Sequence, residues 1–515
     1  MIRKFPRNAP TGSRNHRNLW RALGVASALA LAGCGGDDNG SDDEGPTADD
    51  ELRTLIQDLF LTGDPSRERA LPDIDSPLAD LGMKLFFTKA LSGDLDTACV
   101  SCHHPVLGGG DGLSMPVGAE AEDPDLVGPG RAHSPEGTNY DGGPTVPRNA
   151  STTFNLGMWD AVLSHDGRVE SLLKESSQNG AIGGIRTPDS FIGAADPDAG
   201  ENLPTAQSRF WVTSPEEMQG FNFVPDGTNA EVREALELRL RGEDPDLEDI
   251  DWLPEFQTAF DDPEGEAEEL VIFENIAFAL GEYLRSQVFV DTPWKAFVAG
   301  DDSALSDDAK AGALLFFRGS DEGGADCANC HGGDFFTDES VHTLAVPQIG
   351  RGKGDENGLR VSDDFGRFRE NGVETDRYAF RTPGLINVAV TGPWGHDGAY
   401  ATLEGMVRHH LDPSEAVANY DTSQLEPGVQ ITDLVVNTQF ALEKLGAEQA
   451  AGTTLLRDQD LSDKQVNQIL SFLEEGLTDP CVLDRECLDP WIPGADDTDP
   501  DGLRLEAVDE DGVPL

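Results

Sequence analysis

The pattern C-x-x-C-H occurs twice in this chain, as CVSCH at 99–103 and CANCH at 327–331. Two thiols spaced three residues apart can add to the two vinyl groups of one porphyrin, and the histidine that follows is placed to bind its iron. A zinc site would need four ligands and a redox dithiol needs no histidine, so neither explains the pattern as well. The sequence therefore predicts two covalently bound c-type haems. The predicted haem-binding residues are Cys99, Cys102, His103, Cys327, Cys330 and His331, with His103 and His331 as iron ligands.

The first 60 residues have the features of an export signal followed by a linker. Residues 1–21 carry six basic side chains and no acidic one, and an apolar run too short to span a bilayer follows them. A lipobox at 31–34 predicts a signal peptide over 1–34 and lipid on Cys34, with a plain cleaved signal as the alternative. Acidic residues dominate 35–60 and predict a disordered tether. We therefore expect a periplasmic protein that contacts a membrane only through lipid on Cys34.

The net charge of the chain is strongly negative. It contains 96 acidic and 37 basic residues, which gives a formal charge of −59. This charge excludes nucleic acid as a partner and would repel anionic lipid. Two interpretations stay open: the surface steers a cationic electron donor, or it is a solvated surface suited to high salt.

Two further cysteines, Cys481 and Cys487, are left after the haem and lipid sites are assigned. An oxidising compartment favours a disulfide between them, which would staple the C-terminal segment. Residues 479–515 are predicted to be an acidic tail. The run DTDPDG at 497–502 resembles the start of a calcium loop, but its twelfth position is Val508 and not glutamate, so we interpret it as part of the tail.

Short segments around the first haem motif recur in the same order around the second. LGMKLFF at 81–87 precedes CVSCH, and AGALLFF at 311–317 precedes CANCH. SHDGRVESL at 164–172 and GHDGAYATL at 395–403 follow their motifs at similar distances. The repeated order predicts a duplicated haem domain. The expected domains are an N-terminal haem domain at 61–260 and a C-terminal haem domain at 261–478.

Apolar residues at 268–287 recur at helical spacing without proline, which predicts a long buried helix between the two domains. Strand signals are weak, and the 57 glycines and 32 prolines leave little regular structure elsewhere. We therefore expect a mainly α fold, made of two cytochrome-c-like haem domains related by internal duplication, rich in loops and with little β structure.

The order LFF, C-x-x-C-H, PRN, DGR, EM, LFF, C-x-x-C-H, TP-x-L-x-N-V, HDG and TLE resembles the bacterial di-haem cytochrome c peroxidases and the related MauG-type enzymes over about 75–475. The resemblance implies an enzyme that reacts with hydrogen peroxide. Cleaving the O–O bond requires an open iron position, a group that moves a proton and a source of two electrons. The family places the open haem in the first domain and a closed, electron-transferring haem in the second.

The resemblance also implies residues for the first haem. Its peroxidases carry a histidine latch on the loop after the first motif, and that position here is Ala119, so the first haem is expected to be open in every redox state. Met115, His104 and His133 are the possible substitutes. The family's proton shuttle precedes Met218 in Pro215-Glu216-Glu217-Met218, which makes Glu217 the candidate acid–base. A second pocket residue, usually glutamine, aligns with Glu175, before an insertion at 176–206.

For the second haem, matching TLE to TLE places the family's distal ligand at His410, with Met406 and His409 as competitors. His410 would make a bis-histidine haem, which lowers the potential relative to a thioether ligand. Relatives place a tryptophan between the haems where this chain has His165. Trp159 and Trp394 could replace it.

A calcium ion at the domain interface is also implied by the family. The matching residues are the Asn149 side chain and the carbonyls of Thr391 and Pro393, and such oxygen ligands suit Ca²⁺.

Three functions are therefore considered. The first, which we favour, is a peroxidase that removes hydrogen peroxide with electrons from a small cytochrome c or cupredoxin. The second is a MauG-like enzyme that uses peroxide to oxidise tryptophan or tyrosine on a partner protein. The third is an electron-transfer di-haem lipoprotein without peroxide chemistry.

Overall fold

The computed structural model describes residues 46–515 except 246, 248–249 and 355–359. The predicted signal peptide, the lipid site at Cys34 and the first part of the tether lie outside these residues. None of the helices in the described part combines the length and the apolar character that a membrane span requires.

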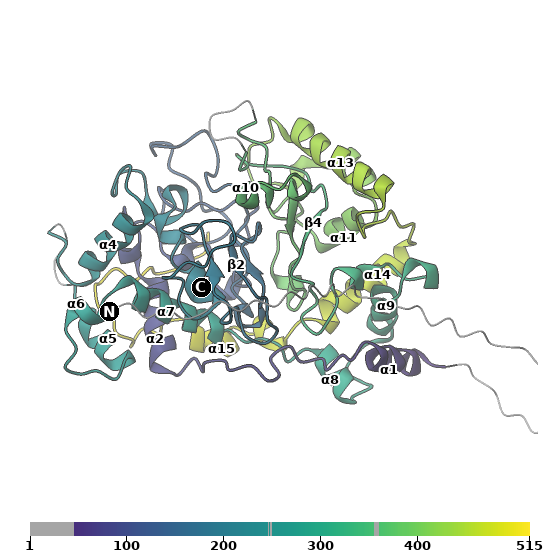
Figure 1. The fold of residues 1–515 in the computed structure, drawn as a ribbon, viewed down its shortest axis with the longest axis horizontal. Helices are drawn as coiled ribbons and strands as arrows, with labels where there is room; N and C mark the ends of the chain where they lie inside the picture. The colour runs from purple at the N-terminus through teal and green to yellow at the C-terminus, as the bar shows by residue number, and fades with distance from the viewer. Residues whose placement is uncertain (1–45, 246, 248–249, 355–359) are drawn as a thin grey trace, which may run out of the picture. The chain divides into compact units, whose positions relative to one another are not determined.

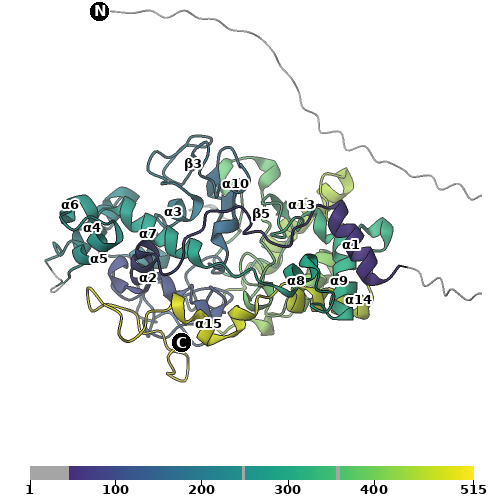
Figure 2. The same ribbon diagram turned by 90° about the horizontal axis from the view of Figure 1, so that it is seen from below.

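Helices are the main regular structure of the described residues and little β structure is present, as predicted (Figures 1 and 2). Three short strands form one antiparallel sheet in the order β1-β2-β3, and two form a second antiparallel pair. The helices are α1 (Ala48–Asp58), α2 (Pro77–Phe87), α3 (Leu203–Gln207), α4 (Asn229–Leu240), α5 (Leu253–Ala259), α6 (Ala267–Leu270), α7 (Phe273–Ser286), α8 (Pro293–Ala299), α9 (Asp307–Phe317), α10 (Phe368–Asn371), α11 (Leu403–Leu411), α12 (Pro413–Ala418), α13 (Leu434–Ala451), α14 (Asp463–Ser471) and α15 (Arg485–Leu488). The strands are β1 (Val162–Leu163), β2 (Val169–Ser171), β3 (Ile185–Arg186), β4 (Val341–Thr343) and β5 (Ala379–Arg381).

Two helix pairs pack closely near the two haem motifs, and each crosses at a glycine. α2 packs on α7 and α9 packs on α14. A Cβ on Gly82 of α2 would lie 2.0 Å from the carbonyl oxygen of Ala279, and one on Gly312 of α9 would lie 1.8 Å from that of Gln468. Only glycine allows such an approach. The two glycines hold the same place in LGMKLFF and AGALLFF.

A second correspondence links the two halves through one peptide group. Asn155 and Asn387 both adopt a left-handed backbone conformation and each begins a short 3-10 helix. The side-chain amides of both donate to the carbonyl of Phe289, at 3.0 and 2.9 Å. Their amide oxygens accept from the backbone of Phe289 and Asp479, each at 2.8 Å. The two asparagines therefore clamp the chain between the halves from both sides.

The apolar core is divided between the same two groups of helices. One cluster includes buried residues of α2, α4, α5 and α7, and the other includes residues of α1, α8, α9, α11 and α14. Figures 1 and 2 show these groups at opposite ends of the described chain. The predicted helix at 268–287 is interrupted, because Val271 and Ile272 separate α6 from α7. α7 also packs in the N-terminal core, so the predicted boundary at 260 does not divide the two cores.

Two predictions about the ends of the described chain are wrong. The predicted tether at 35–60 contains α1, which begins with a capping box at Thr47 and buries Leu52 and Ile56 in the C-terminal core. α1 has an apolar face that packs in this core, and the acidic composition of the segment as a whole gives no sign of that face. The predicted acidic tail also packs: Asp501 accepts hydrogen bonds from Thr88 and Trp252, each at 2.8 Å.

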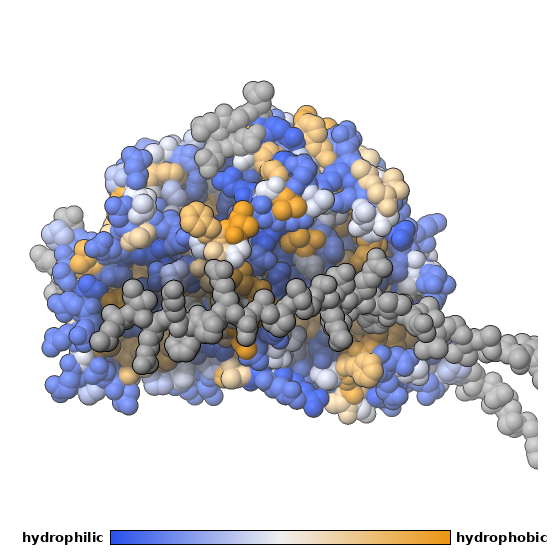
Figure 3. Space-filling model, viewed as in Figure 1, coloured by the Kyte–Doolittle hydropathy of each residue, from blue (hydrophilic) through white to orange (hydrophobic). Residues whose placement is uncertain are grey.

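The predicted disulfide between Cys481 and Cys487 forms, with a Cα–Cα distance of 5.3 Å. Beyond it, Leu505 and Ala507 are buried in the N-terminal core. The C-terminal segment is therefore part of the folded protein. The face shown in Figure 3 is mostly hydrophilic, with apolar residues in small groups, as the acidic composition predicts.

Candidate functional site

The first haem motif opens onto an apolar cavity, which we call the N-terminal pocket. Cys99, Cys102 and His103 line it, and Phe86 of α2 and Leu280 of α7 contribute to its apolar wall. The two thiols are free. The carbonyl of Gly109 lies 3.2 Å from Nδ1 of His103 and fixes the orientation of the ring. Burial raises the pKa of the Cys99 thiol to about 12, so it is neutral in this cavity.

The second motif opens onto a larger cavity, the C-terminal pocket. It is lined by Cys327, Cys330, His331 and His410, together with Met406. Nδ1 of His331 lies 3.1 Å from the carbonyl of Phe336, and Nδ1 of His410 lies 2.9 Å from that of Met406. Among the described residues, the His410 ring has no hydrogen-bond partner other than the Met406 carbonyl. Burial is the main reason why the pKa of both imidazoles is lowered, so both are neutral, the form that binds metal.

The ring centres of His331 and His410 are 6.1 Å apart. A metal bound between two imidazole nitrogens at about 2 Å from each requires ring centres roughly 6 Å apart. The free thiols, the apolar walls and this spacing fit a covalent haem whose iron lies between the two histidines.

The competing ligands for the second haem differ in their contacts. His409 is buried away from the C-terminal pocket, and both of its nitrogens are engaged: Nδ1 with the Tyr400 hydroxyl at 2.8 Å and Nε2 with the Leu344 carbonyl at 2.9 Å. Met406 lines the pocket one helical turn before His410 on α11. The structure therefore leaves His410 and Met406 facing the pocket and removes His409.

Glu217 lines the N-terminal pocket on the segment Pro215–Gln219. Burial raises the pKa of its carboxyl group, although the charges of Lys353 and Arg168 oppose this shift. Glu175 is exposed and does not line the pocket, so the structure does not bring it to Glu217. An amide side chain, that of Gln207, lines the same pocket as Glu217.

Gln207 ends α3, lines the N-terminal pocket, and donates from Nε2 to the Ser164 hydroxyl at 3.1 Å. The predicted insertion at 176–206 separates Glu175 from Gln207 in the sequence. Gln207 is the first residue after this insertion and stands ten positions before Glu217.

Ala119 is buried next to the segment that carries Glu217. Its amide donates to the carbonyl of Glu216 at 3.2 Å, and a Cβ on Gly118 would lie 2.3 Å from that of Glu217. The three alternative ligands, Met115, His104 and His133, are all buried, but none of them lines the N-terminal pocket. Among the described residues, no predicted substitute for the latch reaches this cavity.

His165 lines both pockets and so lies in the wall between them. Its Nε2 lies 3.0 Å from the backbone carbonyl of Asn149. Burial, with the nearby charges of Arg381 and Arg148, lowers the pKa of His165 to about 3, so this imidazole is neutral. The sequence therefore placed this residue correctly between the two cavities.

Trp159 and Trp394 line only the C-terminal pocket. The guanidinium carbon of Arg381 lies 3.7 Å from the ring centre of Trp159. A cation on this face disfavours a positive charge on the indole. Neither tryptophan therefore occupies the shared wall that His165 holds.

The predicted calcium ligands Asn149, Thr391 and Pro393 all line the C-terminal pocket. The Asn149 amide nitrogen donates to the carbonyls of Leu113 and Ser114 at 2.8 and 3.3 Å. Its Oδ1 and the carbonyls of Thr391 and Pro393 accept no hydrogen bond from any residue in the described ranges. These oxygens have the chemistry that a hard cation requires.

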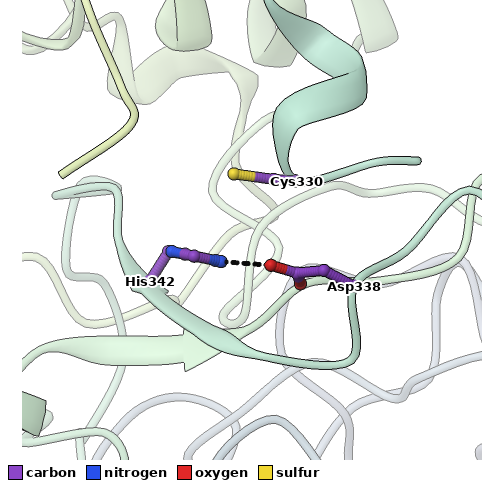
Figure 4. A group of neighbouring side chains, drawn as sticks. All are labelled: Cys330, Asp338 and His342. Atoms are coloured by element: carbon purple, nitrogen blue, oxygen red, sulfur yellow. Dashed lines mark hydrogen bonds and ion pairs between the residues drawn. The ribbon is translucent and has the colours of Figure 1, made fainter. Parts of the chain in front are cut away.

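Cys330, Asp338 and His342 form a further cluster, with ligand atoms within 4.8 Å of one another (Figure 4). His342 and Asp338 interact at 2.7 Å, and this hydrogen bond is the main reason why the pKa of His342 is raised to about 10. Cys330 belongs to the CANCH motif. A haem bound there would use this thiol. We therefore interpret Asp338 and His342 as an ion pair beside the haem attachment site.

A model of the di-haem cytochrome c peroxidase family, which includes MauG, matches residues 76–303. The methylamine utilization protein MauG of Methylorubrum extorquens is 28% identical over 337 residues, 65% of this chain and 69% of that protein. The cytochrome c551 peroxidase of Pseudomonas aeruginosa is 26% identical over 328 residues, 64% of this chain and 70% of that protein. The family match and these relatives support the di-haem cytochrome c peroxidase and MauG superfamily for this chain.

The relatives named cytochrome c peroxidase and MauG support a peroxide-dependent oxidoreductase, and the di-haem family implies two c-type haems. The cytochrome c peroxidase Ccp of Escherichia coli is also similar, with 25% identity over 364 residues, 70% of this chain and 57% of that protein. The crystal structure of a MauG-like protein associated with microbial copper homeostasis superposes with a TM-score of 0.52 at 21% identity, covering 82% of this chain and 96% of that one. This last likeness supports the mainly helical fold.

Proposed function

We propose that this enzyme reduces hydrogen peroxide at the N-terminal pocket, with electrons relayed through the C-terminal pocket. The observation that carries the proposal is the difference between the pockets. Glu217 and Gln207 line the first, where no predicted second ligand reaches among the described residues, whereas His410 faces His331 across the second. An open site with a proton carrier suits peroxide, and a closed site suits electron transfer.

Bound haem would supply redox-active iron in each pocket. His103 and His331 would hold the iron, each with its ring fixed by a backbone carbonyl. Glu217 would take a proton from one peroxide oxygen and return it to the other, which requires its carboxylate form at the start. Gln207 donates one amide N–H to the Ser164 hydroxyl, which fixes the amide group. Its second N–H and its amide oxygen would orient peroxide.

His410 is our candidate for the second iron ligand of the C-terminal haem, because its ring centre lies 6.1 Å from that of His331, a spacing that one iron atom would fit. Met406 remains the competitor on the same helix. His165 is proposed as the residue between the two haems. A neutral imidazole there would mediate electron transfer without becoming oxidised itself.

The second candidate function is oxidation of tryptophan or tyrosine on a partner protein, as in the name-giving MauG enzymes. The specific observation in its favour is Ala119, which stands where a latch would close the first haem. An iron site open in the resting ferric state can react with peroxide before any electron arrives. In the peroxidase role the partner would instead be a small cytochrome c or cupredoxin.

Three further expectations belong to the proposal. Calcium would be held by Asn149 with the carbonyls of Thr391 and Pro393. The two halves would derive from an internal duplication, which the paired glycines of α2 and α9 and the paired asparagines at Phe289 support. Export to the periplasm and lipid on Cys34 rest on the sequence at 1–34.

The proposed function is tested by mixing peroxide with the purified ferric protein and then with the half-reduced protein, while the haem absorption is followed. Turnover with a small reduced cytochrome supports the peroxidase role. Reaction in the ferric state without turnover, accompanied by loss of tryptophan or tyrosine in a partner protein, supports the MauG-like role. No reaction with peroxide in any state would overturn both.

A further inference from the structure

Lys353 lines the N-terminal pocket although it comes from the C-terminal half of the chain. It lies on the connection between β4 and β5, outside the residues 76–303 that the family model matches. The surrounding backbone accounts for this reach from the other half of the chain.

The two positions that flank Lys353 have no room for a side chain. Gly352 has a φ of +63°, and a Cβ there would lie 2.1 Å from the carbonyl of Ser362. A Cβ on Gly354 would lie 1.9 Å from the carbonyl of Arg360. These contacts require glycine on both sides of the lysine. The sequence Gly-Lys-Gly therefore presents one long side chain on a tightly packed backbone.

This turn is tied to the N-terminal half on its other side. Arg351 forms an ion pair with Asp141 at 3.0 Å and donates to the carbonyl of Asn139. A Cβ on Gly350 would lie 2.3 Å from the methyl group of Met115, which belongs to the loop that ends at Ala119. The turn thus lies against the same loop that packs on the Glu217 segment.

The ammonium of Lys353 makes no hydrogen bond or ion pair with any residue that the structure describes. The nearby cations differ in this respect, because Arg148 pairs with Asp364 at 2.7 Å and Arg168 pairs with Asp166 at 2.8 Å. Among the described residues, Lys353 is therefore the cation of this pocket without a direct partner. Lys353 is half-buried, and a charge partly withdrawn from water is costly unless another charge balances it.

The Glu217 carboxylate is the anion that shares the cavity with Lys353. The charges of Lys353 and Arg168 both lower the pKa of Glu217, while burial and the neighbouring Glu216 raise it. Burial, Arg168 and Arg148 lower the pKa of Lys353 to about 8, against the opposing charges of Glu217 and Asp166. The lysine thus remains mostly protonated at neutral pH and lines the same cavity as the carboxylate.

We propose that Lys353 is a positioning residue of the peroxide site, whose ammonium is the counter-charge that keeps the Glu217 carboxylate ionised and able to accept a proton. The C-terminal half of the chain would then complete the N-terminal site. This inference rests on the proposed role of Glu217, but it concerns the charge of that group and not the reaction with peroxide.

The test is a pH titration of the haem-loaded protein by infrared spectroscopy. The absorption of the protonated Glu217 carboxyl group is identified by its loss in Glu217→Gln. In Lys353→Met the midpoint of this absorption should move to higher pH, because the ionised form has lost its counter-charge. Lys353→Arg should keep the midpoint near that of the wild type. Lys174→Met removes an exposed lysine outside the pocket and serves as the matched control.

A second measurement uses fluoride as a small anionic probe of the ferric N-terminal site. Its dissociation constant should rise about tenfold in Lys353→Met and return toward the wild-type value in Lys353→Arg. Lys353→Gln replaces Lys353→Met if the latter fails to bind haem. An unchanged carboxyl midpoint in the neutral variants would overturn the inference, even if the wild type reacts with peroxide. A carboxyl midpoint that shifts to higher pH in these variants would support the inference even if the wild type does not react with peroxide.

Discussion

The clamp at Phe289 allows a quantitative prediction about the scaffold that holds both pockets. Asn155→Ala removes two buried hydrogen bonds, to the carbonyl and the amide of Phe289, at 3.0 and 2.8 Å. Two such bonds contribute about 1 kcal/mol each, the unpaired amide adds about 1–2 kcal/mol, and alanine in the left-handed region adds about 1 kcal/mol. The free energy of unfolding should therefore fall by about 4 kcal/mol. Asn387→Ala should have a similar effect.

Urea titration of the haem-loaded protein, followed by circular dichroism, measures this loss. Asn419→Ala is the control, because that side chain is exposed and makes one hydrogen bond, to the Glu415 carbonyl; its effect should stay within about 0.5 kcal/mol. The double variant should lose more than the sum of the single variants, since both amides donate to one carbonyl and either alone still satisfies it. A loss below about 1 kcal/mol in both single variants would refute the clamp.

Three other results are expected. Glu217→Gln should slow the reaction with peroxide by about 10²–10⁴-fold in stopped-flow measurements, and an unchanged rate would remove Glu217 from the mechanism. In the wild type this rate should fall as the pH drops through a Glu217 pKa that burial has raised above the ordinary carboxyl value, because the protonated form cannot accept a proton; a rate independent of acid pH would contradict this. Cys481→Ser should lower the free energy of unfolding by about 2 kcal/mol, given the short loop that the disulfide closes, and a stability equal to wild type would contradict a structural role.

The fold class and the haem motifs could be predicted because they depend on local pattern. Each C-x-x-C-H motif carries its chemistry within five residues, and the repeated LFF segments marked the two helices that cross at Gly82 and Gly312. Composition does not reveal a short apolar helix face in an acidic segment. In α1, the acidic residues around Leu52 and Ile56 dominate the average composition, which therefore predicts a tether.

Sequence motifs predict the pocket residues that lie within a single motif. They do not predict a residue that reaches a pocket from a distant segment of the chain. Glu217 and His410 stand inside recognisable motifs, and the structure places both in the expected cavities. Glu175 is exposed and does not line the N-terminal pocket, whereas Gln207, the first residue after 176–206, does. Lys353 reaches the N-terminal pocket from more than 130 residues beyond Glu217, a distance that no local pattern spans.

The central claim is that the two haems differ in coordination, the first open and the second closed by His410. Electron paramagnetic resonance of the ferric protein tests it most directly. We expect one high-spin and one low-spin signal in the wild type, and loss of the low-spin signal in His410→Ala while the other is unchanged. Two low-spin signals in the wild type, or a low-spin signal that persists in His410→Ala, would contradict the account.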